Sequence, residues 1–298
     1  MSDHEVRQTD DGCRIENFNL HSPAMGRDIG VVVVLPPNHE QHAPLPVLYA
    51  LHGMGAPYAA WSEMPPLRRQ LAEQPMLVVS FDGDRAGAYL DATEKPDSQF
   101  TTFFFDELVP FIDEHYPTNG LRGVTGFSMG GFGAVHYMLT KPDAFASVSA
   151  LSGAFDWYLG GPDGEPSDSL EALLGPPADN PGAYDAISIR RRVQARIDAG
   201  EPLPPIMLHC GSDDFLLDDN RALADFLAAQ NRAIRERLEA RAGEDADGRA
   251  VTEQWARERI DYVYKESPGG HNWPFWRDAS AAIVDFHWRT FQNAGVDR

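Results

Sequence analysis

The sequence predicts an α/β fold with a mostly parallel central sheet and helices on both of its faces. Short apolar runs of strand length alternate along the chain with longer segments whose apolar residues recur at helical spacing. Glycine, proline and aspartate mark the turns between them, and no internal repeat interrupts the pattern. Strand and helix in alternation produce parallel strands that are covered on both faces. With 298 residues and 43% hydrophobic composition, we expect a single domain over residues 1–298.

Seven strands are expected from the β-rich apolar runs, which are bounded by turn residues. They lie at 31–35, 46–51, 76–81, 121–127, 147–151, 205–210 and 260–264. Four helices are expected from the spacing of apolar residues and from helix stop signals such as Pro117. They lie at 100–116, at 130–139, from about residue 218 onward, and at 273–291.

Two segments do not follow the alternation. Residues 157–186 are rich in Gly, Pro, Asp and Ser and follow a predicted strand, so we expect a loop or small cap over the functional site. Residues 235–259 are charged and largely helix-prone, and Gly243 and Gly248 interrupt them. We expect a solvated helical insertion there. The alternative is a surface for self-association, which would make the protein a homo-oligomer.

Composition excludes several classes of function. There are 45 acidic and 25 basic residues, and the net charge of −20 repels phosphate backbones, so no nucleic-acid partner is expected. No apolar run is long enough for a membrane span. The start, Met-Ser-Asp-His-Glu, lacks the features of a secretory signal, so a cytoplasmic location is expected, although a removed signal would leave the same start. Cys13 and Cys210 form neither a disulfide framework nor a metal motif.

A G-x-S-x-G motif places a candidate nucleophile at Ser128. The motif spans 126–130, follows an extended apolar segment and precedes a small-residue helix start. A serine exposed on a sharp strand-to-helix turn needs small neighbours, because the backbone there is strained and closely packed; this is the nucleophile elbow of α/β hydrolases. The alternative is a glycine-rich turn with an idle serine.

The candidate base is His271. A serine nucleophile needs a base that is oriented by an acid, and in this fold the chain order is serine, acid, histidine. Two histidines come late enough. His271 follows the flexible Ser-Pro-Gly-Gly loop after a predicted strand, whereas His287 lies inside the last predicted helix and is expected to be a helix-surface or packing residue.

The acid is expected in the loop after the strand at 205–210. Asp213 and Asp214 are both placed there, and the residues alone leave the choice between them open. Asp218 and Asp219 come at the start of the next helix, where carboxylates favour the helix dipole. The spacing of these aspartates matches no calcium loop, so neither a metal nor another cofactor is expected.

The negative oxygen of a tetrahedral intermediate requires backbone donors. One is expected to be the amide after the nucleophile, that of Met129. The other is expected in the loop at 52–55, where glycines allow close approach of the backbone to a substrate. His52 ends a strand and precedes the serine, so it is expected to order this loop rather than to act as the base.

Five motifs together resemble the esterase D-like branch of the α/β hydrolases, which includes S-formylglutathione hydrolases, tributyrin esterases, feruloyl esterases and mycolyltransferases. They are Leu51-His-Gly-Met-Gly with Trp61, Gly126-Phe-Ser-Met-Gly-Gly, Leu151-Ser-Gly, Cys210-Gly-Ser-Asp-Asp-Phe-Leu and Gly269-Gly-His-Asn-Trp. The resemblance implies an α/β-hydrolase fold and a catalytic triad of Ser128, Asp214 and His271. It favours Asp214 over Asp213 and implies oxyanion amides at Met54 and Met129.

The expected activity is that of a serine carboxylesterase acting on a small-molecule ester. Aromatic residues near the motif loops, among them Trp61, Trp157 and Trp273, would line an apolar pocket for a short-chain or aromatic acyl group. Each of them is as well explained by packing. The alternatives are an acyltransferase to a sugar or lipid hydroxyl, a thioesterase of the S-formylglutathione hydrolase type, and a binding module without turnover.

Overall fold

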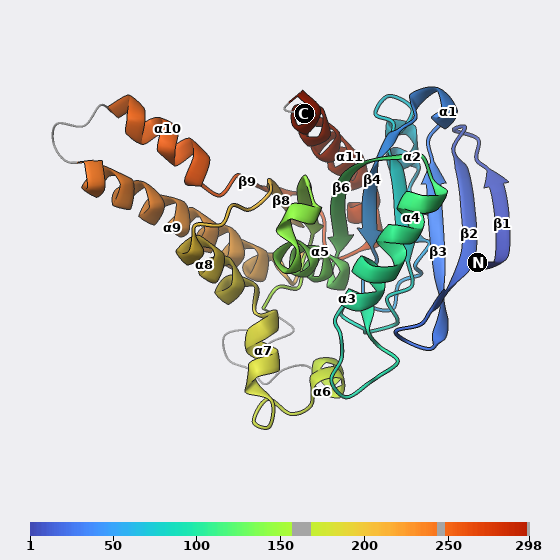
Figure 1. The fold of residues 1–298 in the computed structure, drawn as a ribbon, viewed down its shortest axis with the longest axis horizontal. Coiled ribbons are helices and arrows are strands. Elements are labelled where there is room, and N and C mark those ends of the chain that lie inside the picture. The colour runs from blue at the N-terminus through green and yellow to red at the C-terminus, as the bar shows by residue number, and fades with distance from the viewer. Residues whose placement is uncertain (157–167, 243–247, 297–298) are drawn as a thin grey trace.

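One sheet of nine strands runs through the part of the chain that the structure describes, in the order β1-β2-β3-β5-β4-β6-β7-β8-β9 (Figure 1). The structure is a computed structural model, and it describes residues 1–156, 168–242 and 248–296. The pairings β1–β2, β2–β3 and β3–β5 are antiparallel. The five remaining pairings, from β5 through β4 to β9, are parallel. This arrangement confirms the predicted mostly parallel sheet.

The strands are β1 (Ser2–Gln8), β2 (Arg14–Ser22), β3 (Arg27–Leu35), β4 (Leu45–Leu51), β5 (Leu77–Phe81), β6 (Thr118–Phe127), β7 (Ser147–Leu151), β8 (Ile206–Gly211) and β9 (Tyr262–Ser267). The helices are α1 (His39–His42), α2 (Pro65–Gln70), α3 (Phe100–Thr102), α4 (Val109–His115), α5 (Met129–Thr140), α6 (Asp168–Leu174), α7 (Pro181–Ile187), α8 (Ile189–Ala199), α9 (Leu217–Ala242), α10 (Gly248–Glu258) and α11 (Trp273–Val296). Short helical turns are η1 (Ala60–Glu63), η2 (Phe103–Leu108, a π-helical turn) and η3 (Pro142–Ala144).

Helices cover both faces of the sheet, because successive side chains of a strand point to opposite faces. On β3, Val31 and Val33 join the core under α4 and α5, whereas Val32 and Val34 join the core under α2 and α11. In Figure 1, α4 and α5 lie in front of the sheet, and α11 lies behind it with α2. Strands β4, β5, β7 and β8 are buried along their whole length, as their continuous apolar sequences predict, whereas the edge strand β9 is partly exposed.

Two antiparallel strands at the N-terminal edge were not expected from the sequence. All seven residues of β1 are exposed, so its polar sequence has no buried face to produce an alternating pattern. In β2 the buried positions are irregular, and polar residues such as Asn17 and Asn19 separate the apolar ones. The backbone of β1 nevertheless pairs with β2, and β2 pairs with the whole length of β3.

The two unusual segments of the sequence contain helices. Residues 157–167 of the expected loop or cap lie outside the described residues, and the remainder contains α6 and most of α7. The charged segment at 235–259 forms the distal part of α9 and then α10, and Figure 1 shows this hairpin projecting away from the sheet. In the described part of the chain, no helix is long and apolar enough to cross a bilayer.

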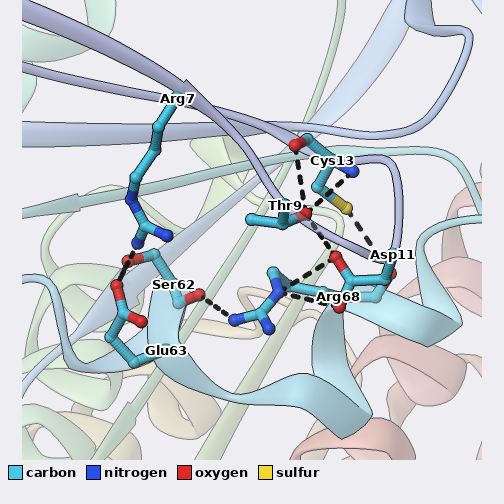
Figure 2. Close-up of polar contacts among 7 residues, drawn as sticks. All are labelled: Arg7, Thr9, Asp11, Cys13, Ser62, Glu63 and Arg68. Atoms are coloured by element: carbon cyan, nitrogen blue, oxygen red, sulfur yellow. Dashed lines mark hydrogen bonds and ion pairs between the residues drawn. The ribbon is translucent and has the colours of Figure 1, made fainter.

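A polar network connects the turn between β1 and β2 to α2 and η1 (Figure 2). Arg68 of α2 donates from Nε to both carboxylate oxygens of Asp11, at 2.9 and 3.1 Å, and from a terminal nitrogen to the backbone carbonyl of Ser62, at 2.6 Å. Burial raises the pKa of Asp11, but hydrogen bonds from Thr9 and Arg68 outweigh it, so the net pKa is lowered. Ser62 belongs to η1, so this network holds η1 in place. The loop at 52–59 leads directly into η1.

Candidate active site

Ser128 lies on the sharp turn between β6 and α5, as the motif predicts. Its φ is 56° and its ψ is −121°, a strained backbone conformation for a residue with a side chain. A Cβ atom at Gly126 would lie 2.1 Å from the carbonyl oxygen of Gly130, and one at Gly130 would lie 2.3 Å from that of Leu51. The two glycines of the motif are therefore required by close backbone packing, and they allow the serine side chain to stand free at the end of β6.

Ser128, His271 and Asp214 form one hydrogen-bonded chain. The Nε2 atom of His271 is 2.9 Å from the hydroxyl oxygen of Ser128. The Nδ1 atom is 3.0 and 3.1 Å from the two carboxylate oxygens of Asp214. Because a carboxylate only accepts, Nδ1 carries the proton, and Nε2 is left to accept from the serine hydroxyl. The three residues come from the ends of β6 and β8 and from the loop that precedes α11.

The structure distinguishes the two candidate acids. The side chain of Asp214 is fully buried, whereas Asp213 is exposed. Besides His271, the backbone amide of Leu216 donates to Asp214 at 2.8 Å. Burial raises the pKa of Asp214, but hydrogen bonds from His271, Ser152 and the Leu216 amide lower it, and the net pKa is lowered. A carboxylate in this setting is ionised at neutral pH.

The loop at 52–55 passes directly beside Ser128. A Cβ atom at Gly53 would lie 3.2 Å from the Cβ of Ser128 and 2.8 Å from the ring of Phe127, so only glycine fits there. His52 is buried and orders the loop as expected: its Nδ1 donates to the Gly53 carbonyl and its Nε2 accepts from the Gly83 amide, both at 2.9 Å. Burial lowers its pKa, which keeps the ring neutral for these two roles. The amide of Met129 is the first of α5, where helix N–H groups have no acceptor within the helix.

An apolar cavity of about 200 Å³ opens beside the serine hydroxyl. It is lined by Gly53, Met54, Ala56, Phe127, Ser128, Ala154, Phe215, Leu216, His271 and Trp276. Trp61 does not line it, contrary to expectation: this residue is fully buried, and its indole donates to the Leu51 carbonyl at 2.9 Å. Trp273 stands near the cavity with its ring edge toward Phe127, at 6.4 Å between centroids, but does not line it. Trp157 lies outside the described residues.

Phe215 was missed in the sequence. It directly follows Asp214, its ring lies 4.4 Å from that of His271, and it is 66% exposed. An aromatic residue next to the acid in the same loop was the available signal. The loop length that turns it toward the histidine could not be read from the sequence.

A second serine–histidine contact lies deep in the core. His287 of α11 is fully buried and contacts the hydroxyls of Ser147 and Ser149, at 2.7 and 2.8 Å. Burial lowers its pKa to about 3. Both serines are also fully buried, on β7. None of the three residues lines the cavity beside Ser128. A neutral histidine between two buried hydroxyls is a packing arrangement, one of the two roles expected for this residue.

Comparison with known proteins identifies the family. The sequence model of the Esterase family, described as "Putative esterase", matches residues 22–286. An acetyl esterase from Caldicellulosiruptor saccharolyticus is 25% identical in an alignment 294 positions long, and the match covers 88% of this chain and 93% of the relative.

Solved structures share the fold. S-formylglutathione hydrolase from Agrobacterium tumefaciens gives a TM-score of 0.71 at 22% identity and covers 96% of this chain and 98% of its own. A ferulic acid esterase from the anaerobic fungus Anaeromyces mucronatus gives a TM-score of 0.61 at 17% identity, with coverages of 98% and 93%. The chain belongs to the Esterase family and is a carboxylic ester hydrolase with an α/β-hydrolase fold.

Proposed function

We propose that Ser128 is the nucleophile of this esterase, His271 its general base and acid, and Asp214 the group that orients the imidazole. The observation that carries the proposal is the continuous chain of hydrogen bonds from the Ser128 hydroxyl through His271 to Asp214. His271 takes the hydroxyl proton as the serine oxygen attacks the ester carbonyl, and it returns that proton to the departing alcohol. Water, deprotonated by the same imidazole, then releases the carboxylic acid and restores the serine.

The backbone amides of Met54 and Met129 are the proposed donors to the tetrahedral oxyanion. Two features support them. The close approach of Gly53 to Ser128 supports the amide of the next residue, Met54, as one donor. The Met129 amide is at the N-terminal end of α5, where the helix dipole also favours negative charge.

The proposed substrate is a small carboxylic ester with a short acyl chain. The cavity beside Ser128 is enclosed by apolar side chains, among them Phe127, Ala154 and Leu216, and its volume of about 200 Å³ suits a short acyl group. Met54 and Phe215, which line the cavity, and Trp273 near it belong to the few large hydrophobic side chains exposed on the described surface. Their position around the opening favours an apolar alcohol portion.

The direct test is hydrolysis of p-nitrophenyl acetate by single variants. Ser128→Ala and His271→Gln are expected to lower kcat by about 10⁴-fold or more, because removal of either group disables the whole triad. Ser147→Ala is the matched control, since Ser147 also contacts a histidine but lies in the core. Wild-type turnover by Ser128→Ala would refute the proposal, as would loss of activity in Ser147→Ala with the fold intact.

Two alternatives use the same triad with a different partner. An acyltransferase would pass the acyl group to a hydroxyl other than water, and a thioesterase would prefer S-formylglutathione. Measuring how the acyl group divides between water and an added alcohol distinguishes hydrolysis from acyl transfer. Comparing kcat/KM for oxygen esters with that for S-formylglutathione distinguishes an esterase from a thioesterase. The cavity lining favours ester hydrolysis, because its described residues include no lysine, arginine or carboxylate that could bind a polar acceptor or glutathione.

A further inference from the structure

We infer that Trp276 and Phe215 are positioning residues of the active site: their rings pack against the imidazole of His271 and hold it in place while the nucleophile carries an acyl group. The inference rests on the proposed triad and deepens it. It assigns the holding of the base to two side chains that exchange no proton with it.

Five aromatic rings form a continuous column that runs from the core through the active site to the surface. Their order is Trp61, Phe127, Trp276, His271 and Phe215, and successive ring centroids are 5.6, 4.6, 4.9 and 4.4 Å apart. The two ends differ in burial, since Trp61 is fully buried and Phe215 is 66% exposed. The base is therefore the fourth ring of a packed series.

The buried end of the column is fixed to the segments around the nucleophile. The indole of Trp61 donates to the carbonyl of Leu51, the last residue of the strand that leads into the loop at 52–55, at 2.9 Å. Phe127 directly precedes Ser128 on the turn between β6 and α5. A ring that stacks on Phe127 is therefore placed relative to the nucleophile.

Trp276, in the first turn of α11, links this turn to the base. Its ring stacks on that of Phe127, with the two planes 19° apart, and it stands at 88° to the ring of His271. Its Nε1 lies 3.3 Å from the hydroxyl oxygen of Ser152, the residue that follows β7. The stacking contact and the hydrogen bond together fix the indole, so it acts as a spacer between the nucleophile turn and the imidazole.

Phe215 contacts the imidazole from a different element, the loop between β8 and α9. It directly follows Asp214, and its ring is tilted by 51° to that of His271. The side chain of His271 is only 16% exposed, so neighbouring groups cover most of the imidazole. One of the two rings that contact the base thus comes from the segment that also supplies the acid.

The base needs these contacts because its hydrogen bond to the nucleophile is temporary. In the free enzyme, Nε2 of His271 is 2.9 Å from the Ser128 hydroxyl and Nδ1 contacts Asp214. When the serine oxygen carries an acyl group, its proton has left with the alcohol, and it can no longer donate to Nε2. The imidazole then keeps its contacts with Asp214 and with the two rings. From this position it must deprotonate the attacking water.

Loss of a ring is therefore expected to slow deacylation more than acylation. During acylation the Ser128 hydroxyl and Asp214 both orient the imidazole of His271, whereas during deacylation only Asp214 does so. A ring that served only as a wall of the cavity would, when removed, raise KM and leave kcat unchanged. A variant that only loosened the fold would slow both half-reactions alike.

The test measures the two half-reactions separately with p-nitrophenyl acetate. The acylation rate constant is taken from the pre-steady-state burst of p-nitrophenolate. The deacylation rate constant is taken from the loss of the acetyl group from the intact protein, followed by mass spectrometry after excess substrate is removed. Trp276→Leu is expected to slow deacylation by about 10²-fold, the cost of a small displacement of a catalytic group, and acylation by about tenfold or less. Phe215→Ala is expected to slow deacylation by roughly tenfold and acylation by about twofold or less.

Conservative variants show whether the ring itself is responsible. Trp276→Phe and Phe215→Tyr each keep an aromatic ring and are expected to stay within about threefold of the wild-type deacylation rate. Trp288→Leu is the matched control, since Trp288 packs against the same apolar core but lies roughly 18 Å farther along α11. Both of its rate constants are expected to stay within about twofold of wild type.

Phe215→Ala keeps the test decisive if Trp276→Leu folds poorly, because Phe215 is largely exposed and contributes little to the core. Wild-type deacylation in Phe215→Ala would overturn the inference. Equal slowing of both half-reactions, or a Phe215→Tyr variant as slow as Phe215→Ala, would also overturn it. Failure of the triad itself would appear differently, as the absence of an acetyl group on Ser128 in the wild-type protein.

Discussion

The backbone of Gly53 touches the nucleophile: a Cβ atom added to this glycine would lie 3.2 Å from the Cβ of Ser128 and 2.8 Å from the ring of Phe127. The loop at 52–55 packs closely against the side chains of Phe127 and Ser128. This loop carries the proposed Met54 donor, and an added methyl group at Gly53 would displace either the loop or its neighbours.

Gly53→Ala is therefore expected to lower kcat toward short esters by about 10²-fold, the cost of losing one oxyanion donor. The added methyl group must push the loop or the Phe127 ring away, and the amide moves with the loop. Steady-state kinetics with p-nitrophenyl acetate checks the effect. Gly182→Ala is the control, because a Cβ there meets nothing within 4 Å. If Gly53→Ala keeps the wild-type kcat, the loop is not the source of an oxyanion donor.

The two neighbouring aspartates are expected to respond in opposite ways. Asp214→Asn should lower kcat by about 10³- to 10⁴-fold, because an amide no longer selects the productive tautomer of His271. Asp213→Asn should stay within about twofold of wild type, since this side chain is exposed. The two variants carry the same chemical change at adjacent positions, so each is a control for the other. Equal losses in both variants would contradict the assignment of the acid.

The acyl preference is expected to follow the size of the cavity. Leu216→Ala removes a lining side chain, so the ratio of kcat/KM for p-nitrophenyl butanoate to that for the acetate should rise by roughly tenfold, the usual value of one or two methylene groups in an apolar pocket. Leu223→Ala is the matched control: it removes a buried leucine that does not line the cavity. An unchanged ratio in Leu216→Ala would place the acyl group elsewhere.

His287 is expected to make stability depend on pH. Burial lowers its pKa from 6.5 in the unfolded chain to about 3 in the folded protein. Below pH 6.5 the unfolded chain therefore takes up a proton that the folded protein does not, and the contribution of His287 to stability falls until the pH reaches about 3.

The comparison is between wild type and His287→Gln, whose free energies of unfolding are measured in urea at pH 7 and pH 5. The variant is expected to be less stable at pH 7, and the gap should narrow by roughly 2 kcal/mol at pH 5, because each pH unit per proton is worth about 1.4 kcal/mol. A gap of the same size at both pH values would show that His287 is not a buried neutral group.

The sequence was most informative where apolar runs are continuous or where chemistry needs a particular residue. The buried parallel strands β4, β5, β7 and β8 were predictable, because burial on both faces leaves an uninterrupted apolar sequence. Four of the helices were predictable from apolar spacing, whereas α2 and α8 were not expected. Ser128 and His271 were predictable from the need for glycine around a strained turn and for a flexible loop near a strand end.

Other parts were not predictable for physical reasons. Strand β1 has no buried face, so only its backbone pairing identifies it as a strand. The choice between Asp213 and Asp214 depends on which side chain a tight turn directs inward, and both residues have the same sequence signature. The error at Trp61 has a similar origin: an aromatic residue after a site loop can equally pack beneath the loop, as it does here.

The most direct test of the central claim is to locate the acyl group on the enzyme. Wild-type protein is mixed with p-nitrophenyl acetate, quenched in acid within the first turnover and digested, and the peptides are analysed by mass spectrometry. We expect one acetyl group on the peptide that contains Ser128, and no acetylation of that peptide in Ser128→Ala. Acetyl transfer to a different residue, together with turnover that survives in Ser128→Ala, would contradict the account.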